Sequence, residues 1–196
     1  NLQTVAALLR LQARRLDTGP ARAALEEAVR RVGSIAIVHE TLSQTLDEQV
    51  EFDSIADRVL AMVAEISPGR VEGRRTGRFG ILTAEVATPL AMVLTELLQN
   101  ALEHGFGPGR GGRVEIGAVR QSGDGSPGAD RLLITVEDNG RGIPEGFDPQ
   151  SSGNLGLQIV RTLVVGELGG SFDMQPVPEG GTRVLLDLKV DSARSV

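Results

Sequence analysis

A carboxylate and a carboxamide stand four residues apart, inside a segment whose apolar residues recur at helical spacing. Residues i and i+4 share one side of a helix, so Glu96 and Asn100 should lie on one face, which His104 continues one turn later. An Asn oxygen can ligate Mg²⁺, a hard ion that prefers oxygen donors. A Glu carboxylate can orient an incoming nucleophile or accept its proton. An ordinary solvated helix face would show the same spacing, so this pair needs support from elsewhere in the chain.

A second polar motif, Asp138–Pro144 with the sequence DNGRGIP, directly follows a predicted strand. Loops at the ends of strands often carry binding residues. Asp138 could accept a hydrogen bond from an exocyclic amine, such as the 6-amino group of adenine. Gly140 and Gly142 would let the backbone approach a flat base closely. A simple Gly/Asp turn is the alternative interpretation of this motif.

Two further glycine motifs follow. Gly153–Leu157, with the sequence GNLGL, opens a predicted helix, and the free N–H groups of a glycine-rich helix start can bind phosphates. The P-loop pattern G-x-x-x-x-G-K-[ST] does not occur, and Lys189 is the only lysine. Gly180–Thr182 is typical of a turn before a strand. It gains a binding role only if Thr182 points toward Asp138.

The composition excludes several classes of function. The 196 residues are 40% hydrophobic, which is enough for a real core, but no apolar run approaches the ~18 residues needed to cross a bilayer. A net charge of -6 argues against general nucleic-acid binding. The absence of Cys excludes disulfides and thiolate sites, and only two His make a zinc site improbable. With no Trp or Tyr, a base-stacking platform is excluded as well.

The first fifty residues predict a helical hairpin. The chain begins at Asn1 inside a helical pattern, which we interpret as a piece of a longer protein. A first helix ends near Asp17, the sequence at 18–20 forms a turn, and a second helix covers about 21–47. Two helices alone bury too little apolar surface, so we expect residues 1–50 to dimerise into a four-helix bundle.

Residues 51–196 predict an α+β domain with helices on one face of a mixed sheet. Its helices are expected at 52–66, 88–104 and 155–168. Its strands are expected within 70–85 and at 114–119, 132–136, 171–175 and 182–190.

The order of the polar motifs resembles that of one superfamily, the Bergerat-fold ATPases, which include type II topoisomerases, ninety-kilodalton heat-shock chaperones, sensor histidine kinases and mismatch-repair ATPases. The resemblance covers about residues 66–190 and implies an α/β sandwich that binds ATP with Mg²⁺. It matches Glu96 to the catalytic carboxylate, Asn100 to the Mg²⁺ ligand and Asp138 to the adenine-reading carboxylate. The other matched nucleotide-binding positions are His104, Gly140, Gly142, Ile143, Gly153, Leu155, Gly156 and Thr182.

The helical hairpin resembles the dimerisation and phosphoacceptor helices of a subfamily of cytosolic actinobacterial sensor histidine kinases. The likeness rests on residues 1–12, with the sequence NLQTVAALLRLQ, and on residues 31–42. It implies a two-component sensor histidine kinase that is a cytoplasmic homodimer. Such an enzyme passes the γ-phosphoryl group of ATP to a His on the arm and then to an Asp of a response-regulator receiver domain. An upstream sensory domain controls it.

Several positions stay open in this interpretation. The acceptor His of the subfamily would lie just before Asn1, so we expect this stretch of chain not to phosphorylate itself. His39 matches a non-acceptor His and fits a core or hinge role better than an acceptor role. His104 either approaches the nucleotide or interacts with the helix C-terminus. Glu103 stands where many relatives carry a basic residue, and we expect it to point to solvent.

Two other functions fit parts of the pattern. A Ser protein kinase of the anti-sigma-factor type uses the same ATPase fold, although the hairpin has no clear purpose there. A dimeric ATP-sensing scaffold without catalysis would retain the nucleotide site and signal through its shape.

Overall fold

The computed structural model describes residues 2–15, 19–22, 24–26, 28–29, 32–33, 36, 49–66, 71–106, 111–123, 130–148 and 155–191. In the arm, helix α1 spans Leu2–Arg15, in agreement with the predicted periodicity. The described positions of the predicted second helix, between residues 21 and 36, are helical as well. Positions 37–48, which include His39, lie outside the described residues. No helix in the described part of the chain is long and apolar enough to cross a bilayer.

A short strand that the sequence patterns did not predict follows the arm. β1, Gln49–Glu51, pairs antiparallel with β3, Ile81–Thr83. Helix α3 begins at the next residue and spans Phe52–Ile66, the range expected from its apolar spacing. The division of the chain between residues 50 and 51 stays a prediction, and it falls inside β1.

Five strands form one mixed sheet in the order β2-β4-β5-β7-β6. They span Val71–Gly77 (β2), Gly112–Gln121 (β4), Asp130–Asp138 (β5), Ser171–Pro176 (β6) and Thr182–Val190 (β7). β2 runs parallel to β4, and the other neighbouring pairs are antiparallel. The register places Asp138, the last residue of β5, opposite Val114 of β4 and Thr182 of β7. Two of the predicted polar motifs therefore meet where two neighbouring inner strands, β5 and β7, end and begin.

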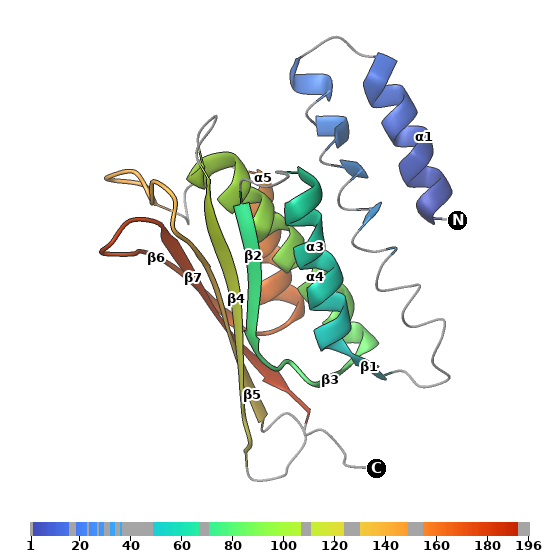
Figure 1. Ribbon diagram of the computed structural model, residues 1–196. Helices are drawn as coiled ribbons and strands as arrows, with labels where there is room; N and C mark the ends of the chain where they lie inside the picture. Colours follow the sequence, from blue (N-terminus) through green and yellow to red (C-terminus); the bar gives the residue numbers. More distant parts are fainter. Residues whose placement is uncertain are drawn as a thin grey trace.

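Helices cover one face of this sheet, as predicted (Figure 1). They are α3, α4 (Ala84–Asn100) with its π-helical extension η1 (Ala101–Gly105), and α5 (Leu155–Arg161) with its π-helical extension η2 (Thr162–Glu167). Successive strand residues point to opposite faces, so Leu132, Ile134 and Val136 of β5 all enter the buried core. The α+β sandwich expected for the second part of the chain is confirmed.

Helix α4 begins earlier than the sequence predicts. The expected start at Thr88 is wrong, because the helix already begins at Ala84 and contains Pro89. Proline usually marks a helix start, since it lacks an N–H group and its ring crowds the preceding turn. Here Ala87 and Pro89 are both buried, so packing of the first two turns against the core overrides the local preference. The other end agrees with expectation, because the helical run ends at Gly105, one residue beyond the predicted end.

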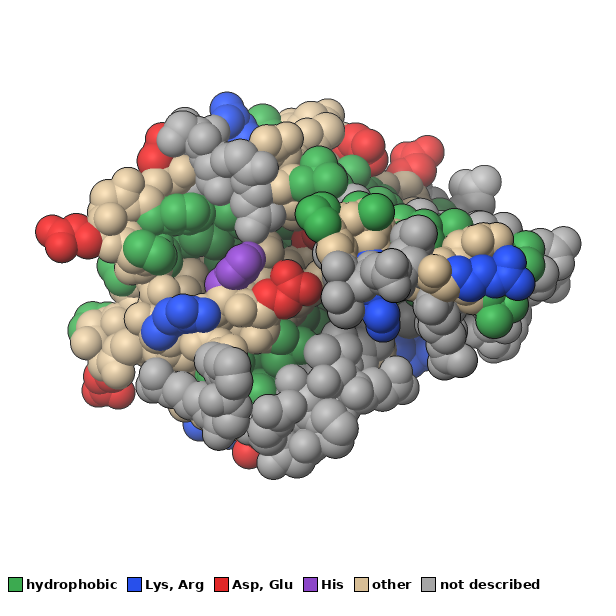
Figure 2. All heavy atoms as spheres, turned by 90° about the horizontal axis from the view of Figure 1, so that it is seen from above, with side chains coloured by type: hydrophobic (Ala, Val, Ile, Leu, Met, Phe, Trp, Pro, Cys, Tyr) green, Lys and Arg blue, Asp and Glu red, His purple; other side chains and the backbone are tan. Residues whose placement is uncertain are grey.

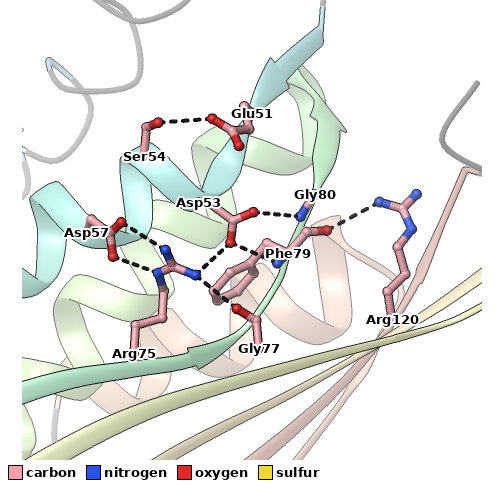
Figure 3. Close-up of polar contacts among 9 residues, drawn as sticks. All are labelled: Glu51, Asp53, Ser54, Asp57, Arg75, Gly77, Phe79, Gly80 and Arg120. Carbon is pink, nitrogen blue, oxygen red and sulfur yellow. Dashed lines mark hydrogen bonds and ion pairs between the residues drawn. The ribbon is translucent and has the colours of Figure 1, made fainter. Parts of the chain in front are cut away.

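A polar cluster holds the loop between β2 and β3 against α3 (Figure 3). We name Asp53, Asp57 and Arg75 the crossover latch. The Asp53 carboxylate accepts hydrogen bonds from the N–H groups of Phe79 at 3.1 Å and Gly80 at 3.3 Å, and from the Arg75 guanidinium at 2.9 Å. Arg75 also pairs with both oxygens of Asp57, at 2.6 and 2.8 Å. The latch thus joins the start of α3 to the end of β2.

Arg120 on β4 secures the same loop from the sheet side (Figure 3). Its guanidinium donates to the carbonyl oxygens of Phe79 at 3.3 Å and Ile81 at 3.0 Å, and to the carboxylate of Asp130 at 3.2 Å. The segment held in this way leads through β3 directly into α4. These contacts therefore fix the start of the helix that carries Glu96 and Asn100.

Candidate nucleotide site

A pocket of about 310 Å³ opens where the end of α4, the end of β5 and the start of β7 meet. Figure 2 looks onto this end of the molecule, where hydrophobic side chains gather around a hollow. The apolar lining residues are Leu97, Ala101, Val136, Ile143, Pro144, Phe147, Leu157, Met174 and Val184. The polar lining residues are Asn100, His104, Asp138, Arg141 and Thr182, joined by Gly105 and Gly142. An apolar slot with a few convergent polar groups is the usual form of a small-molecule site.

Asp138 is the buried carboxylate of this pocket. Its side chain is only 5% exposed and accepts a hydrogen bond from the N–H of Gly140 at 2.8 Å. Thr182 stands opposite Asp138 in the register of β5 and β7, and hydrogen bonding by its N–H and hydroxyl lowers the pKa of this carboxylate, which meets the condition set by the sequence for a role of this threonine. Burial raises the pKa of Asp138, and the bonds from Gly140 and Thr182 only partly oppose this effect. The donors to this carboxylate among the described residues are uncharged. The carboxylate can therefore accept a further hydrogen bond from a neutral donor.

Three glycines let separate backbone segments meet around Asp138. A Cβ on Gly181 would lie 1.8 Å from the Asp138 carbonyl oxygen, and one on Gly140 would lie 2.4 Å from the Gly105 carbonyl oxygen. A Cβ on Gly105 would lie 2.9 Å from a carboxylate oxygen of Asp138. Gly181 also has a φ of 109°, which L side chains rarely adopt. The sequence pattern at 180–182 indicated only a turn, and Gly105 follows the predicted helix end at residue 104, so neither packing role was predicted.

Asn100 carries the clearest sign of an incomplete site. It lines the pocket, and its Nδ2 atom is buried without a hydrogen-bond partner among the described residues. A buried polar atom without a partner is costly, so such atoms usually await a ligand or water. Rotating the side-chain amide by 180° would place its oxygen where the Nδ2 atom now lies. This fits a single protein ligand to Mg²⁺, which keeps several of its waters.

Glu96 lies one turn before Asn100 and is 4% exposed, and it already takes part in a polar interaction. It is not part of the lining of the pocket, whereas Asn100 and His104 are. Of the three residues predicted to share a helix face, Asn100 and His104 therefore reach the pocket and Glu96 does not. The catalytic role of Glu96 stays a prediction.

Arg141 is a lining residue that the sequence analysis did not select. Its backbone N–H donates to the Gly105 carbonyl at 2.9 Å, and its guanidinium donates to the carbonyl of His104. Arginine near a helix C-terminus commonly satisfies the last carbonyl groups in this way. The signal was available, since Arg141 stands between the two glycines of the predicted motif. The His104 ring is exposed at the mouth of the pocket and lines it.

Of the remaining predicted positions, some line the pocket and others do not. Gly142 and Ile143 line the pocket, and Gly140 is buried beside Asp138. Gly156 is buried at the start of α5, while the Leu155 side chain is 52% exposed and outside the pocket lining. Gly153 lies outside the described residues.

Glu103 is exposed to solvent, as expected, and is not among the lining residues of the pocket. It accepts a hydrogen bond from the Gln99 side chain at 2.6 Å.

Comparisons with known proteins agree with this geometry. The family model of the histidine kinase-, DNA gyrase B- and HSP90-like ATPases matches residues 85–192, and a histidine kinase family model matches residues 1–67. The chain is 50% identical over 194 residues to the sensor histidine kinase PdtaS of Mycolicibacterium smegmatis, and the match covers 97% of this chain. It is 49% identical over 195 residues to PdtaS of Mycobacterium tuberculosis. In both cases it spans 37% of the relative's length.

Solved structures show the same fold. The histidine kinase domain of the Erythrobacter litoralis EL346 blue-light activated histidine kinase aligns with a TM-score of 0.73 at 24% identity, covering 96% of each chain. The ATP-binding domain of PrrB from Mycobacterium tuberculosis aligns with a TM-score of 0.57 at 25% identity, covering 74% of this chain and 100% of that one. The motif-based resemblance is thus confirmed by sequence and by fold, and the chain belongs to the histidine kinase-, DNA gyrase B- and HSP90-like ATPase family.

Proposed function

We propose that this chain is the catalytic core of a sensor histidine kinase that binds Mg²⁺ and ATP in the pocket at the end of α4. The observation that carries the proposal is the pairing of two incomplete polar groups in one apolar slot. Among the described residues, the donors to Asp138 are uncharged and the buried amide nitrogen of Asn100 has no partner. A ligand with an amine at one end and a metal-bound anion at the other would satisfy both groups.

The adenine ring fits the Asp138 side of the slot. The carboxylate, when ionised, accepts a hydrogen bond from the 6-amino group, while apolar side chains such as Val136, Met174 and Val184 contact the faces of the base. Burial raises the pKa of Asp138 and so disfavours its charged form. A bound amine donor would oppose this effect by stabilising the ionised carboxylate.

The phosphates fit the Asn100 side. Asn100 would hold Mg²⁺ through its amide oxygen, and the ion would neutralise charge on the phosphate oxygens. In the transfer step, an imidazole nitrogen bonds to the γ-phosphorus while the bond from that phosphorus to the ADP oxygen breaks. We assign Glu96 as the group that takes the imidazole proton. The phosphoryl group then passes from the histidine nitrogen to a carboxylate oxygen of an Asp on the response regulator.

The helical arm supplies the acceptor in this proposal. The acceptor His lies just upstream of Asn1, and the arm pairs with a second copy to form a homodimer. The histidine kinase family match over residues 1–67 supports this assignment, as do the relatives named sensor histidine kinases. An upstream sensory domain and a response-regulator receiver domain are the expected partners in the full-length protein.

Calorimetry of nucleotide binding tests the site. The parent chain should bind ADP, with affinity increased by Mg²⁺, and Asp138→Asn should weaken ADP binding about 30-fold or more, because an amide NH₂ would face the amine of the base. Asp57→Asn is a matched control, since it removes a carboxylate from the crossover latch, remote from the pocket lining. Failure of the parent to bind ADP, or equal binding by parent and Asp138→Asn, would contradict the proposal.

Labelling with ³²P-ATP tests the transfer. This stretch of chain should bind ATP without forming phosphohistidine, whereas a version extended upstream through the acceptor should form an acid-labile phosphoprotein. Acid-stable label would favour a Ser kinase. Label on His39 of the short form would overturn the assignment of the acceptor.

A further inference from the structure

The strand that ends in Asp138 leaves the sheet in an unusual way. In a regular antiparallel ladder, the next pair after Val114 and Asp138 would be Arg113 and Asn139, each donating its N–H to the other's carbonyl. The first bond forms normally, from the Asn139 N–H to the Arg113 carbonyl at 3.2 Å. The second does not use the Asn139 backbone. The Arg113 N–H donates instead to the side-chain Oδ1 of Asn139, at 2.7 Å.

This substitution frees the backbone to turn. Because the side-chain oxygen takes the place of the carbonyl, the chain can leave the strand at Asn139 without leaving the Arg113 N–H unpaired. The turn brings the Gly140 N–H to the Asp138 carboxylate at 2.8 Å. A residue without a side-chain acceptor at this position would favour a longer ladder, which would draw Gly140 away from that carboxylate.

Close packing behind Asn139 shows that the corner is tightly specified. A Cβ on Gly112 would lie 2.6 Å from the Asn139 Oδ1 and 2.1 Å from a ring carbon of Phe106. Phe106 is buried and directly follows Gly105, which lies against the Asp138 carboxylate. Asn139 itself is exposed and does not line the pocket. Any effect it has on a ligand must therefore act through Asp138.

We propose that Asn139 is a positioning residue for base recognition: its carboxamide oxygen replaces a backbone carbonyl in the ladder and so fixes the orientation of the Asp138 carboxylate toward the 6-amino group of adenine. This inference rests on the proposed function, because it assumes that Asp138 binds adenine. It concerns selectivity among bases, since a misplaced carboxylate loses mainly the hydrogen bond to the amine.

The test compares ADP with inosine diphosphate, which carries an oxygen in place of the 6-amino group. Asn139→Ala should weaken ADP binding about tenfold and change inosine diphosphate binding little, so that the ratio of the two affinities falls. Asn139→Asp keeps an acceptor oxygen in the same place and should bind ADP within about threefold of the parent. Gln121→Ala removes a carboxamide from the opposite end of the same strand pair and should behave like the parent.

Each outcome decides between the possibilities. An unchanged affinity ratio in Asn139→Ala, or equal loss of both nucleotides, would mean that Asn139 has only a structural role. Asn139→Asp as defective as Asn139→Ala would also overturn the inference. Melting curves of each variant ensure that binding is compared in folded protein. Should the parent itself not bind ADP, the proposed function fails, which is a separate result.

Discussion

The crossover latch and the pocket each contain a buried carboxylate, but the two carboxylates differ in whether a positive charge balances them. Asp53 accepts two backbone N–H groups and is paired with Arg75, so its charge is balanced within the fold. Asp138 is buried to a similar extent, yet its reported donors are the uncharged groups of Gly140 and Thr182. The difference indicates that the latch serves stability, whereas the pocket keeps capacity for a ligand.

The pKa directions express the same contrast. The hydrogen bonds from Arg75 hold the pKa of Asp57 below its ordinary value, while burial raises the pKa of Asp138. A lowered carboxyl pKa means that the folded state favours the ionised form, and a raised one means that it disfavours it. The fold therefore gains from the charge of Asp57 and tolerates a cost at Asp138 that a bound amine can offset.

The largest expected effect comes from Gly181→Ala. The new Cβ would overlap the Asp138 carbonyl, and the positive φ adds strain, so we expect a loss of about 3 kcal/mol or more in stability and no detectable ADP binding. Gly169→Ala is the matched control, because Gly169 has a φ of 60° but open space around it. Chemical denaturation and calorimetry measure both. Similar losses in the two variants would show that strain, and not contact with Asp138, is responsible.

Next in size is Asp53→Ala. It leaves the N–H groups of Phe79 and Gly80 and the Arg75 guanidinium without their acceptor, and we expect about 3 kcal/mol of destabilisation. Nucleotide affinity, measured well below the melting midpoint, should change little. A large loss of ADP affinity in folded protein would show that the latch and the pocket are not separate in function.

A smaller effect of opposite sign is expected for Asn100→Leu. Removing a buried amide nitrogen without a partner should stabilise the ligand-free protein by about 1 kcal/mol, while the Mg²⁺ dependence of nucleotide binding disappears. Gln99→Leu is the control, since the Gln99 amide is already bonded to Glu103. Thermal melting with and without Mg²⁺-ADP separates the two effects. Destabilisation by Asn100→Leu would contradict the view of an incomplete site.

The smallest effect is that of Asp57→Asn. The Asp57 side chain is 55% exposed, so solvent screens its pair with Arg75, and the cost should be below about 1 kcal/mol at neutral pH. Because the pKa of Asp57 is lowered on folding, its contribution is present above the unfolded value near 3.8 and is lost as pH falls through the folded pKa. Denaturation curves of parent and variant should therefore converge in acid. A difference that widens in acid would be inconsistent with the latch geometry.

Local patterns predicted much of this fold. The helix at 52–66 and the strand at 182–190 agree with their apolar periodicity, because burial on one face imposes a fixed repeat on neighbouring residues. β1 was not predicted, since three residues carry no periodicity and its partner lies far along the chain. The start of α4 was misplaced because tertiary burial of Ala87 and Pro89 outweighed the local signal of the proline.

For the candidate site, too, some residues could be predicted from the sequence and others could not. The types and order of Asp138, Asn100 and Thr182 predicted a shared site, and all three line the pocket. The contacts of Arg141, Gly105 and Gly181 were not predicted, because they join distant backbone segments. Sequence alone determined which carboxylate, carboxamide and hydroxyl groups are available for binding, since those groups belong to the residue types. Only the tertiary structure decided that, among the described residues, Asp138 has neutral donors and the Asn100 nitrogen has no partner, because burial and pairing depend on segments that meet through the sheet register.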